Sequence, residues 1–317
     1  MTSSPTARAV APVSLRATGA TRRRLLVQSV FKSLFGLAAL FTILVTVLIV
    51  VSLVVPSVEF FREVSLARFF STEAWAPLFN PPRFGVWSIV SGTAWITVIA
   101  MVVAIPLGLG VAMYLSEYAP PRVRSVVKPV LEILAGIPTV VLGFFALFFV
   151  NPLLVQRFWP FGTVSTFSGL AAGLVVGVMI VPTVASLAED AMKAVPRGLR
   201  EGAYALGSTR REVTTAVVFP AALSGIVASI VLAGSRAIGE TTIVLLAAGS
   251  RPTLTWNPGD QMQSMASFIG FAGIGDQPTG SIGYLTIFAV GLFLFVITLG
   301  LNVLSIRIVR RFREVYE

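Results

Sequence analysis

The chain has no cysteine and no histidine among its 317 residues. These absences exclude disulfides and thiol chemistry, the usual zinc sites, and acid–base catalysis by histidine. Charged residues are also scarce, at 12%, whereas soluble domains average about 25%. A chain with so little charge is not expected to fold in water.

Apolar residues dominate instead, at 56%, and the mean hydropathy is +0.88. A transmembrane helix needs about 20 mostly apolar residues, and the chain contains six such stretches. We therefore predict an all-α integral membrane protein with six transmembrane helices. The predicted spans are 33–56, 86–115, 130–150, 167–188, 222–249 and 282–306.

The net charge of +10 could suggest nucleic-acid binding, but its placement argues against that partner. Most Lys and Arg residues lie at the N-terminus, at the C-terminus and in two loops, 116–129 and 189–221. Basic residues gather on the cytoplasmic side of membrane proteins. Both termini are therefore predicted to be cytoplasmic. We expect a disordered tail over 1–32, a membrane domain over 33–307 and a short tail over 308–317.

Arg236 and Glu240 stand inside the fifth predicted span. A charge near the bilayer centre costs at least ~2.5–3.5 kcal/mol, so it marks a functional site by default. Their i,i+4 spacing would put both groups on one face of a continuous helix. The pair is either a structural ion pair or a polar step on a transport path. Thr241, Thr242 and Thr139 are weaker candidates for the same path.

The loop 189–221 has the pattern of two helices joined at a hinge. Pro196 suits the start of a helix, and Gly207 suits the position just after its end. Thr209 and Glu212 have the spacing of a capping box that opens a second helix, and Pro220 marks a bend. The loop is therefore predicted to be a rigid elbow; an amphipathic helix on the bilayer is the alternative.

One run of this loop, from Glu201-Gly202-Ala203 through Gly207 to Pro220, resembles the EAA loop of ABC-importer permeases. It departs from that pattern at Gly202, where the family has alanine. The resemblance implies that the loop docks on a separate ATPase subunit, which binds ATP and magnesium. The chain itself has no G-x-x-x-x-G-K-[ST] loop for phosphates, so we expect no catalytic residue, cofactor or metal in it.

Three further segments, 117–120, 134–143 and 236–242, resemble the permease subunits of the phosphate-specific (Pst) importer. The resemblance covers roughly 33–315 and favours the C-type subunit over the A-type. It implies a type I ABC-importer fold in the bacterial inner membrane and alternating access. It also implies as partners a second permease chain, an ATPase dimer and a periplasmic or extracellular phosphate-binding protein, docked on 59–85 and 250–281.

The residues fit an oxyanion substrate. Arg236 offers planar donors that match phosphate geometry, and a carboxylate at Glu240 accepts a proton that phosphate carries and sulfate lacks. Molybdate or sulfate transport remains an alternative, as does a membrane scaffold in phosphate signalling. A membrane enzyme is disfavoured, because the chain lacks His, Cys and any cofactor motif.

Overall fold

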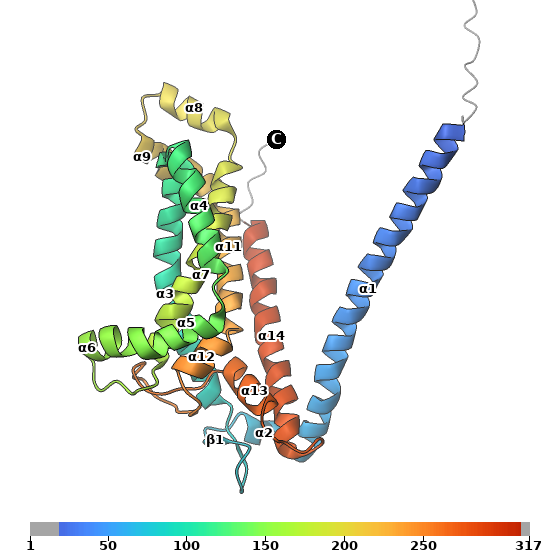
Figure 1. The fold of residues 1–317 in the computed structure, drawn as a ribbon, viewed down its shortest axis with the longest axis vertical. Helices are drawn as coiled ribbons and strands as arrows, with labels where there is room; N and C mark the ends of the chain where they lie inside the picture. Colours follow the sequence, from blue (N-terminus) through green and yellow to red (C-terminus); the bar gives the residue numbers. More distant parts are fainter. Residues whose placement is uncertain (1–18, 312–317) are drawn as a thin grey trace, which may run out of the picture. The chain divides into compact units, whose positions relative to one another are not determined.

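A computed structural model describes residues 19–311 of the chain (Figure 1). The chain divides into two compact units, Met1–Ser52 and Leu53–Glu317. The boundary falls inside the first helix, α1, which runs over Gly19–Glu63.

In the first unit, α1 contains the first predicted span. Its apolar part, Val27–Glu63, is long enough to cross a membrane. The prediction of a disordered tail over 1–32 is wrong for residues 19–32, which are helical, because the Arg, Leu and Ala residues there are good helix formers and extend the helix beyond the apolar stretch. Residues 1–18 lie outside the described part of the chain.

The core of the second unit is a pair of closely packed helices, α3 (Trp87–Met113) and α7 (Gly169–Lys193). The glycine stripe of α7 makes this packing possible. A Cβ added at Gly177 would lie 2.8 Å from the Cβ of Val103, and one at Gly173 would lie 2.8 Å from the Cβ of Ile99. Small residues allow helix backbones to approach each other closely. A π-helical segment, η1 (Tyr114–Tyr118), extends α3.

The third span differs from its prediction over 130–150. An amphipathic helix, α4 (Pro121–Ala135), ends at Gly136. The membrane-length helical run comes later, over Thr139–Phe158, as α5 (Thr139–Phe145), the π-helical η2 (Ala146–Val155) and α6 (Gln156–Phe158). Pro138 explains the break, because proline has no N–H and forces the preceding residue out of helical geometry.

The fifth span is also broken. Helix α11 (Leu223–Ile238) ends where Gly239 takes the C-cap position, and α12 (Thr242–Ala247) begins only after Thr241. Helices α5 and α12 pack against each other: a Cβ at Gly143 would lie 3.4 Å from the Cα of Ile243. The two short helices that follow the breaks are therefore in contact.

The loop 189–221 forms the predicted elbow. Helix α8 (Arg197–Ala205) follows Pro196, which is the N-cap rather than a residue of the first turn. Gly207 has φ 83°, and the capping box of Thr209 and Glu212 opens α9 (Arg210–Glu212). The π-helical η3 (Val213–Val218) and α10 (Phe219–Ala221) follow, and the chain turns by 71° before α11.

The segments assigned to the outer side fold together. A two-stranded antiparallel ribbon, β1 (Trp75–Ala76) and β2 (Arg83–Phe84), lies near α2 (Leu66–Phe69) and α13 (Met265–Gly273). Their core is aromatic and includes Phe60, Phe69, Trp75, Phe84 and Phe268. In Figure 1 this region lies at one end of the second unit, while α8 and α9 lie at the other.

The last helix, α14, runs over Ile282–Arg311. It contains the sixth predicted span and continues past 307, so residues 308–311 are helical rather than part of a tail. In the described part of the chain, five helices are long and apolar enough to cross a membrane, or six if the bent pair around Ala222 counts as one span. Type and order of the spans agree with the prediction.

Candidate functional site

Arg236 lies in the last turn of α11, and its side chain is exposed in the isolated chain. Its Nη1 donates to the hydroxyl of Thr183 on α7, at 3.5 Å. A guanidinium with one long hydrogen bond keeps most of its donors available for an anion. Arg236 belongs to α11, part of a bent apolar helix pair, so it is a cation within an apolar helix.

Glu240 does not form the predicted ion pair with Arg236. Its Oε1 accepts hydrogen bonds from the backbone N–H groups of Thr242 and Ile243, both at 3.1 Å. Among the ion pairs of the described residues, none joins Glu240 to Arg236. The i,i+4 pair is not formed because α11 ends at Gly239, so the two residues do not share a helix. Glu240 caps α12, where a negative charge is favourable.

The three threonines of the predicted path fall at the helix breaks. Thr139 is the first residue of α5, and Thr242 is the first residue of α12. The Thr241 hydroxyl donates to the carbonyl of Gly239 at 3.2 Å. The packing of α5 on α12 brings the elements of Thr139 and Thr242 together. Arg236 approaches α7 instead.

The residues of the EAA-like motif lie on the surface of the elbow. Glu201, Gly202, Gly207 and Pro220 are exposed, and Ala203 packs against the small apolar core beneath α8. Leu206, beside the hinge glycine, is 89% exposed. Sequence reasoning did not single out Leu206. Its place just before the hinge glycine was the available signal.

Arg200 fastens α8 to the membrane helices, and sequence reasoning missed this residue. Its guanidinium donates to the carbonyls of Val195 at 2.6 Å and Met192 at 2.7 Å. It also donates to Glu117 Oε1 at 3.1 Å. Hydrogen bonds of a charged donor are about twice as strong as neutral ones. Arg200 therefore holds the elbow against the ends of α3 and α7.

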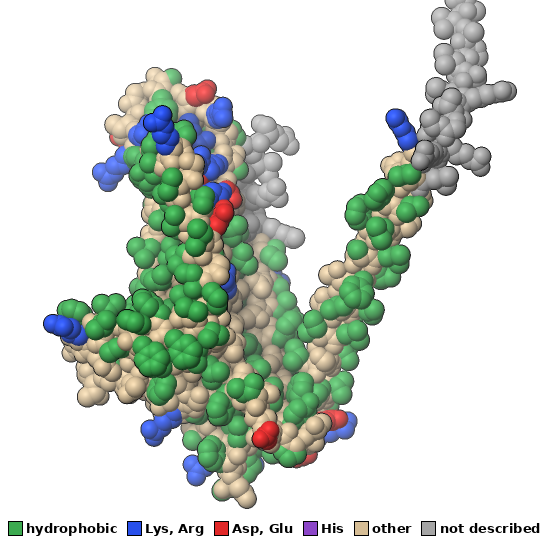
Figure 2. Space-filling view, in the orientation of Figure 1, with side chains coloured by type: hydrophobic (Ala, Val, Ile, Leu, Met, Phe, Trp, Pro, Cys, Tyr) green, Lys and Arg blue, Asp and Glu red, His purple; other side chains and the backbone are tan. Residues whose placement is uncertain are grey.

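Glu189 of α7 is a buried carboxylate, with its side chain 1% exposed. Arg124 Nε of α4 donates to Glu189 Oε1 at 2.8 Å, and Lys193 contacts the same oxygen. Lys128 of α4 lies 3.7 Å from Oε2. Figure 2 shows Lys and Arg side chains gathered around α8, α9 and the adjoining end of α4. The cluster ties α4 to α7.

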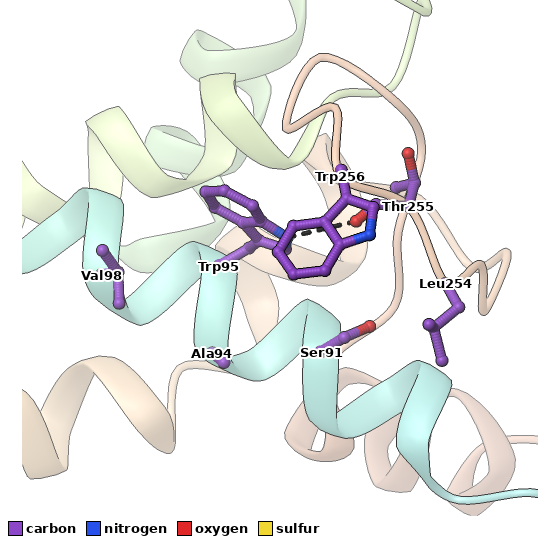
Figure 3. A pocket seen from close by; sticks show the side chains of 7 residues that line it. All are labelled: Ser91, Ala94, Trp95, Val98, Leu254, Thr255 and Trp256. Carbon is purple, nitrogen blue, oxygen red and sulfur yellow. Dashed lines mark hydrogen bonds between the residues drawn. The ribbon is translucent and has the colours of Figure 1, made fainter. Parts of the chain in front are cut away.

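An apolar groove of about 420 Å³ lies beside α3, lined by Trp95, Trp256 and Leu254 among others (Figure 3). Trp95 Nε1 donates to the carbonyl of Thr255 at 3.2 Å, the dashed line in Figure 3. No charged side chain is among the residues that line this groove. It therefore offers nothing to hold an anion and is separate from the Arg236 site.

These features are those of a multi-pass membrane protein: membrane-length helices, breaks before α5 and α12, and a folded elbow at one end of the second unit. Residues 104–314 match the family described as the binding-protein-dependent transport system inner membrane component. The chain belongs to this family. It is a membrane transport subunit of the ABC-importer class and not an enzyme.

Relatives with assigned names agree with this family. The chain is 35% identical over 280 residues to the probable ABC transporter permease protein YqgH of Bacillus subtilis, covering 87% of this chain and 89% of that protein. It is 31% identical over 295 residues to the phosphate transport system permease protein PstC of Haemophilus influenzae, covering 88% and 92%. Among solved structures, a bacterial alginate ABC transporter matches with TM-score 0.62 and 14% identity, over 92% of this chain and 99% of that one. The MetNI methionine ABC transporter matches with TM-score 0.55 and 22% identity, over 72% and 98%. These structures show that the fold is the type I importer permease fold.

Proposed function

We propose that the chain is the C-type permease subunit of an ATP-driven importer that moves inorganic phosphate into the cytoplasm. The observation that carries the proposal is Arg236, an exposed guanidinium on α11 with one 3.5 Å hydrogen bond, to Thr183. A strongly hydrated oxyanion needs charged donors where water is excluded. The names of relatives such as PstC support phosphate as the ion.

The partners follow from the two ends of the second unit. The elbow, with Glu201, Gly202, Ala203, Gly207 and Pro220, would dock on an ATPase dimer that binds ATP and magnesium. The outer region of α2, β1 and α13 would receive phosphate from a binding protein. A second permease chain would complete the path beside Arg236. The elbow end would face the cytoplasm, since basic side chains gather around α8 and α9 (Figure 2). Both termini would also be cytoplasmic, because they too are rich in Lys and Arg.

Transport would proceed by alternating access. Closure of the ATPase dimer would move the elbow, and Arg200 would transmit that movement to α3 and α7 through its three hydrogen bonds. The breaks before α5 and α12 would allow the short helices to shift. Phosphate would then pass Arg236, with Glu240, Thr241, Thr242 and Thr139 at the neighbouring helix ends.

The test is radiolabelled phosphate uptake by cells that carry Arg236→Gln, with membrane insertion and complex assembly measured in parallel. We expect uptake to be lost while assembly is retained. Arg157→Gln, at an exposed arginine of α6, is the matched control and should retain uptake. Competition with sulfate and molybdate in wild-type cells tests the ion. Normal uptake by Arg236→Gln would reject the role of this arginine.

A further inference from the structure

We infer that the chain holds a second oxyanion site, between α4 and α7, for a hydrogen-phosphate group leaving the Arg236 site. The inference rests on the proposed function, because it names the next position of the same substrate. The site is a cavity of about 210 Å³ lined by Lys128, Glu132, Thr183, Ser186 and Glu189, together with apolar residues. Its size is several times the ~30 Å³ share of one water molecule, so it has room for a tetrahedral anion.

The unusual feature of this cavity is a carboxylate oxygen without a donor. Glu189 has a side chain that is 1% exposed, and its Oε1 takes the bonds from Arg124 and Lys193. Its Oε2 is buried and accepts no hydrogen bond from any described residue; the nearest cation, Lys128 Nζ, is 3.7 Å away. Buried polar atoms are nearly always hydrogen-bonded. Oε2 is therefore placed to accept a donor from a ligand.

Hydrogen phosphate can supply that donor, and the other polar groups that line the cavity can donate to its remaining oxygens. Its P–OH would donate to Glu189 Oε2, and its anionic oxygens would accept from Lys128 Nζ and from the hydroxyls of Thr183 and Ser186. Sulfate has no proton to donate at neutral pH. It would leave Oε2 unpaired and add repulsion, so the site would select phosphate over sulfate.

Thr183 connects the two sites. Its hydroxyl accepts from Arg236 Nη1 at 3.5 Å, and the same residue lines the cavity of Lys128 and Glu189. An ion that leaves Arg236 toward the elbow end therefore meets Thr183 and then Lys128. Handover between adjacent sites requires each to bind weakly enough to release the ion.

The charges around the cavity suit release. Lys128, Arg124 and Lys193 are balanced by Glu189, Asp190 and Glu132, and Lys128 also lies 3.3 Å from Asp190 Oδ1. A balanced cluster attracts an anion less strongly than the isolated Arg236 does. The second site is therefore a low-affinity position on the way to the cytoplasm.

The experiment measures equilibrium binding of radiolabelled phosphate to the complete, nucleotide-free importer in phosphatidylcholine nanodiscs. In the Arg236→Gln complex, binding that remains should belong to the second site. Adding Lys128→Gln should weaken that binding by about tenfold, in line with the loss of a charged hydrogen bond. Because Lys128 also holds Asp190, Ser186→Ala is the second variant; it removes one donor without touching an ion pair, and we expect a weaker loss. Arg197→Gln, at an exposed cation of α8, is the control and should bind like the parent complex.

A phosphomonoester lipid headgroup has the same chemistry as free hydrogen phosphate. Adding phosphatidic acid to the nanodiscs distinguishes the sources: unchanged phosphate binding identifies the free ion, and competitive loss identifies the headgroup as an occupant of the same Lys128–Glu189 site. Sulfate at equal concentration should not compete. Binding to the Arg236→Gln complex that neither Lys128→Gln nor Ser186→Ala weakens would overturn the second site. Uptake lost in Arg236→Gln would still support the proposed function, so the two failures are distinguishable.

Discussion

Arg200 of α8 and Glu117 of η1, the segment that extends α3, form an ion pair, with Arg200 Nη2 3.1 Å from Glu117 Oε1 and their side chains 17% and 6% exposed. The same guanidinium binds the carbonyls of Met192 and Val195. One side chain thus joins the elbow to two membrane helices. A rigid joint of this kind can carry force between an ATPase and the spans, which a loose linker cannot.

Replacing Arg200 is expected to loosen this joint. Hydrogen bonds to charged groups contribute about 1.5–3 kcal/mol each, so Arg200→Gln should speed protease cleavage within 197–207 and lower uptake per ATP hydrolysed by the reconstituted complex. Arg197→Gln changes an exposed arginine of the same helix and serves as the control. Equal cleavage and equal uptake in the two variants would contradict the joint.

Substitution of the hinge glycine, Gly207, should impair coupling through backbone strain and not through a steric clash. Gly207 has φ 83°, and a Cβ there would meet no atom within 4 Å. Residues with a Cβ lose about 1–2 kcal/mol in this left-handed conformation, so Gly207→Val should uncouple hydrolysis from uptake, and Gly207→Asn should do so less.

The matched position is Gly202, which lies inside α8 with open space around it. Gly202→Ala restores the alanine of the EAA pattern and should stabilise the helix by about 0.5–1 kcal/mol without loss of uptake. The measurement is the amount of phosphate taken up per ATP hydrolysed, compared between the Gly207 and Gly202 variants. A Gly207→Val importer that couples as well as Gly202→Ala would show that the left-handed hinge is dispensable.

Replacing Glu240 with glutamine, a neutral hydrogen-bond acceptor, should largely preserve protein stability but should reduce phosphate uptake. Glu240→Gln keeps a side-chain oxygen for the N–H groups of Thr242 and Ile243, whereas Glu240→Leu leaves both without that partner. Losing a cap costs about 1 kcal/mol, so thermal stability in detergent should fall for Glu240→Leu and less for Glu240→Gln. If the charge serves the path, both variants lose phosphate uptake. Full uptake by Glu240→Gln would make Glu240 a cap and nothing more.

The α3–α7 contact should not accept a side chain at Gly177. A Cβ there would lie 2.9 Å from the carbonyl oxygen of Ala100 and 2.8 Å from the Cβ of Val103. Overpacking of this kind costs about 1–3 kcal/mol, so Gly177→Ala should lower the melting temperature of the purified complex. Gly110→Ala, on α3 where a Cβ meets no atom within 4 Å, is the control. Identical melting curves would show that the helices can move apart at no cost.

Much of the fold was predictable from the sequence because its causes are local. Long apolar stretches dictate membrane helices wherever they occur. The elbow was predictable for the same reason. Pro196, Gly207 and the capping box of Thr209 and Glu212 each act on their own backbone, within a few residues.

The helix breaks were only partly predictable. The third span was predicted to begin at 130, but it begins after Pro138, at Thr139. The apolar residues of 130–135 belong to the amphipathic helix α4, and in the sequence they look like the start of the span. No proline marks the break at Gly239. There the chain leaves the helix because Glu240 caps α12, and a capping bond competes with helix continuation in a way that spacing alone does not reveal.

By itself, the sequence determined that this is a helical membrane protein with a folded elbow and an arginine in an apolar span, since hydrophobic length, turn residues and charge placement act locally. Only the tertiary structure decided the partners of the charged groups. Arg236 meets Thr183 rather than Glu240, Arg200 meets Glu117, and Glu189 gathers cations from α4 and α7. Except for the i,i+4 contact of Lys193 with Glu189, these pairs join residues far apart in the chain, and helix packing brings them within hydrogen-bonding distance.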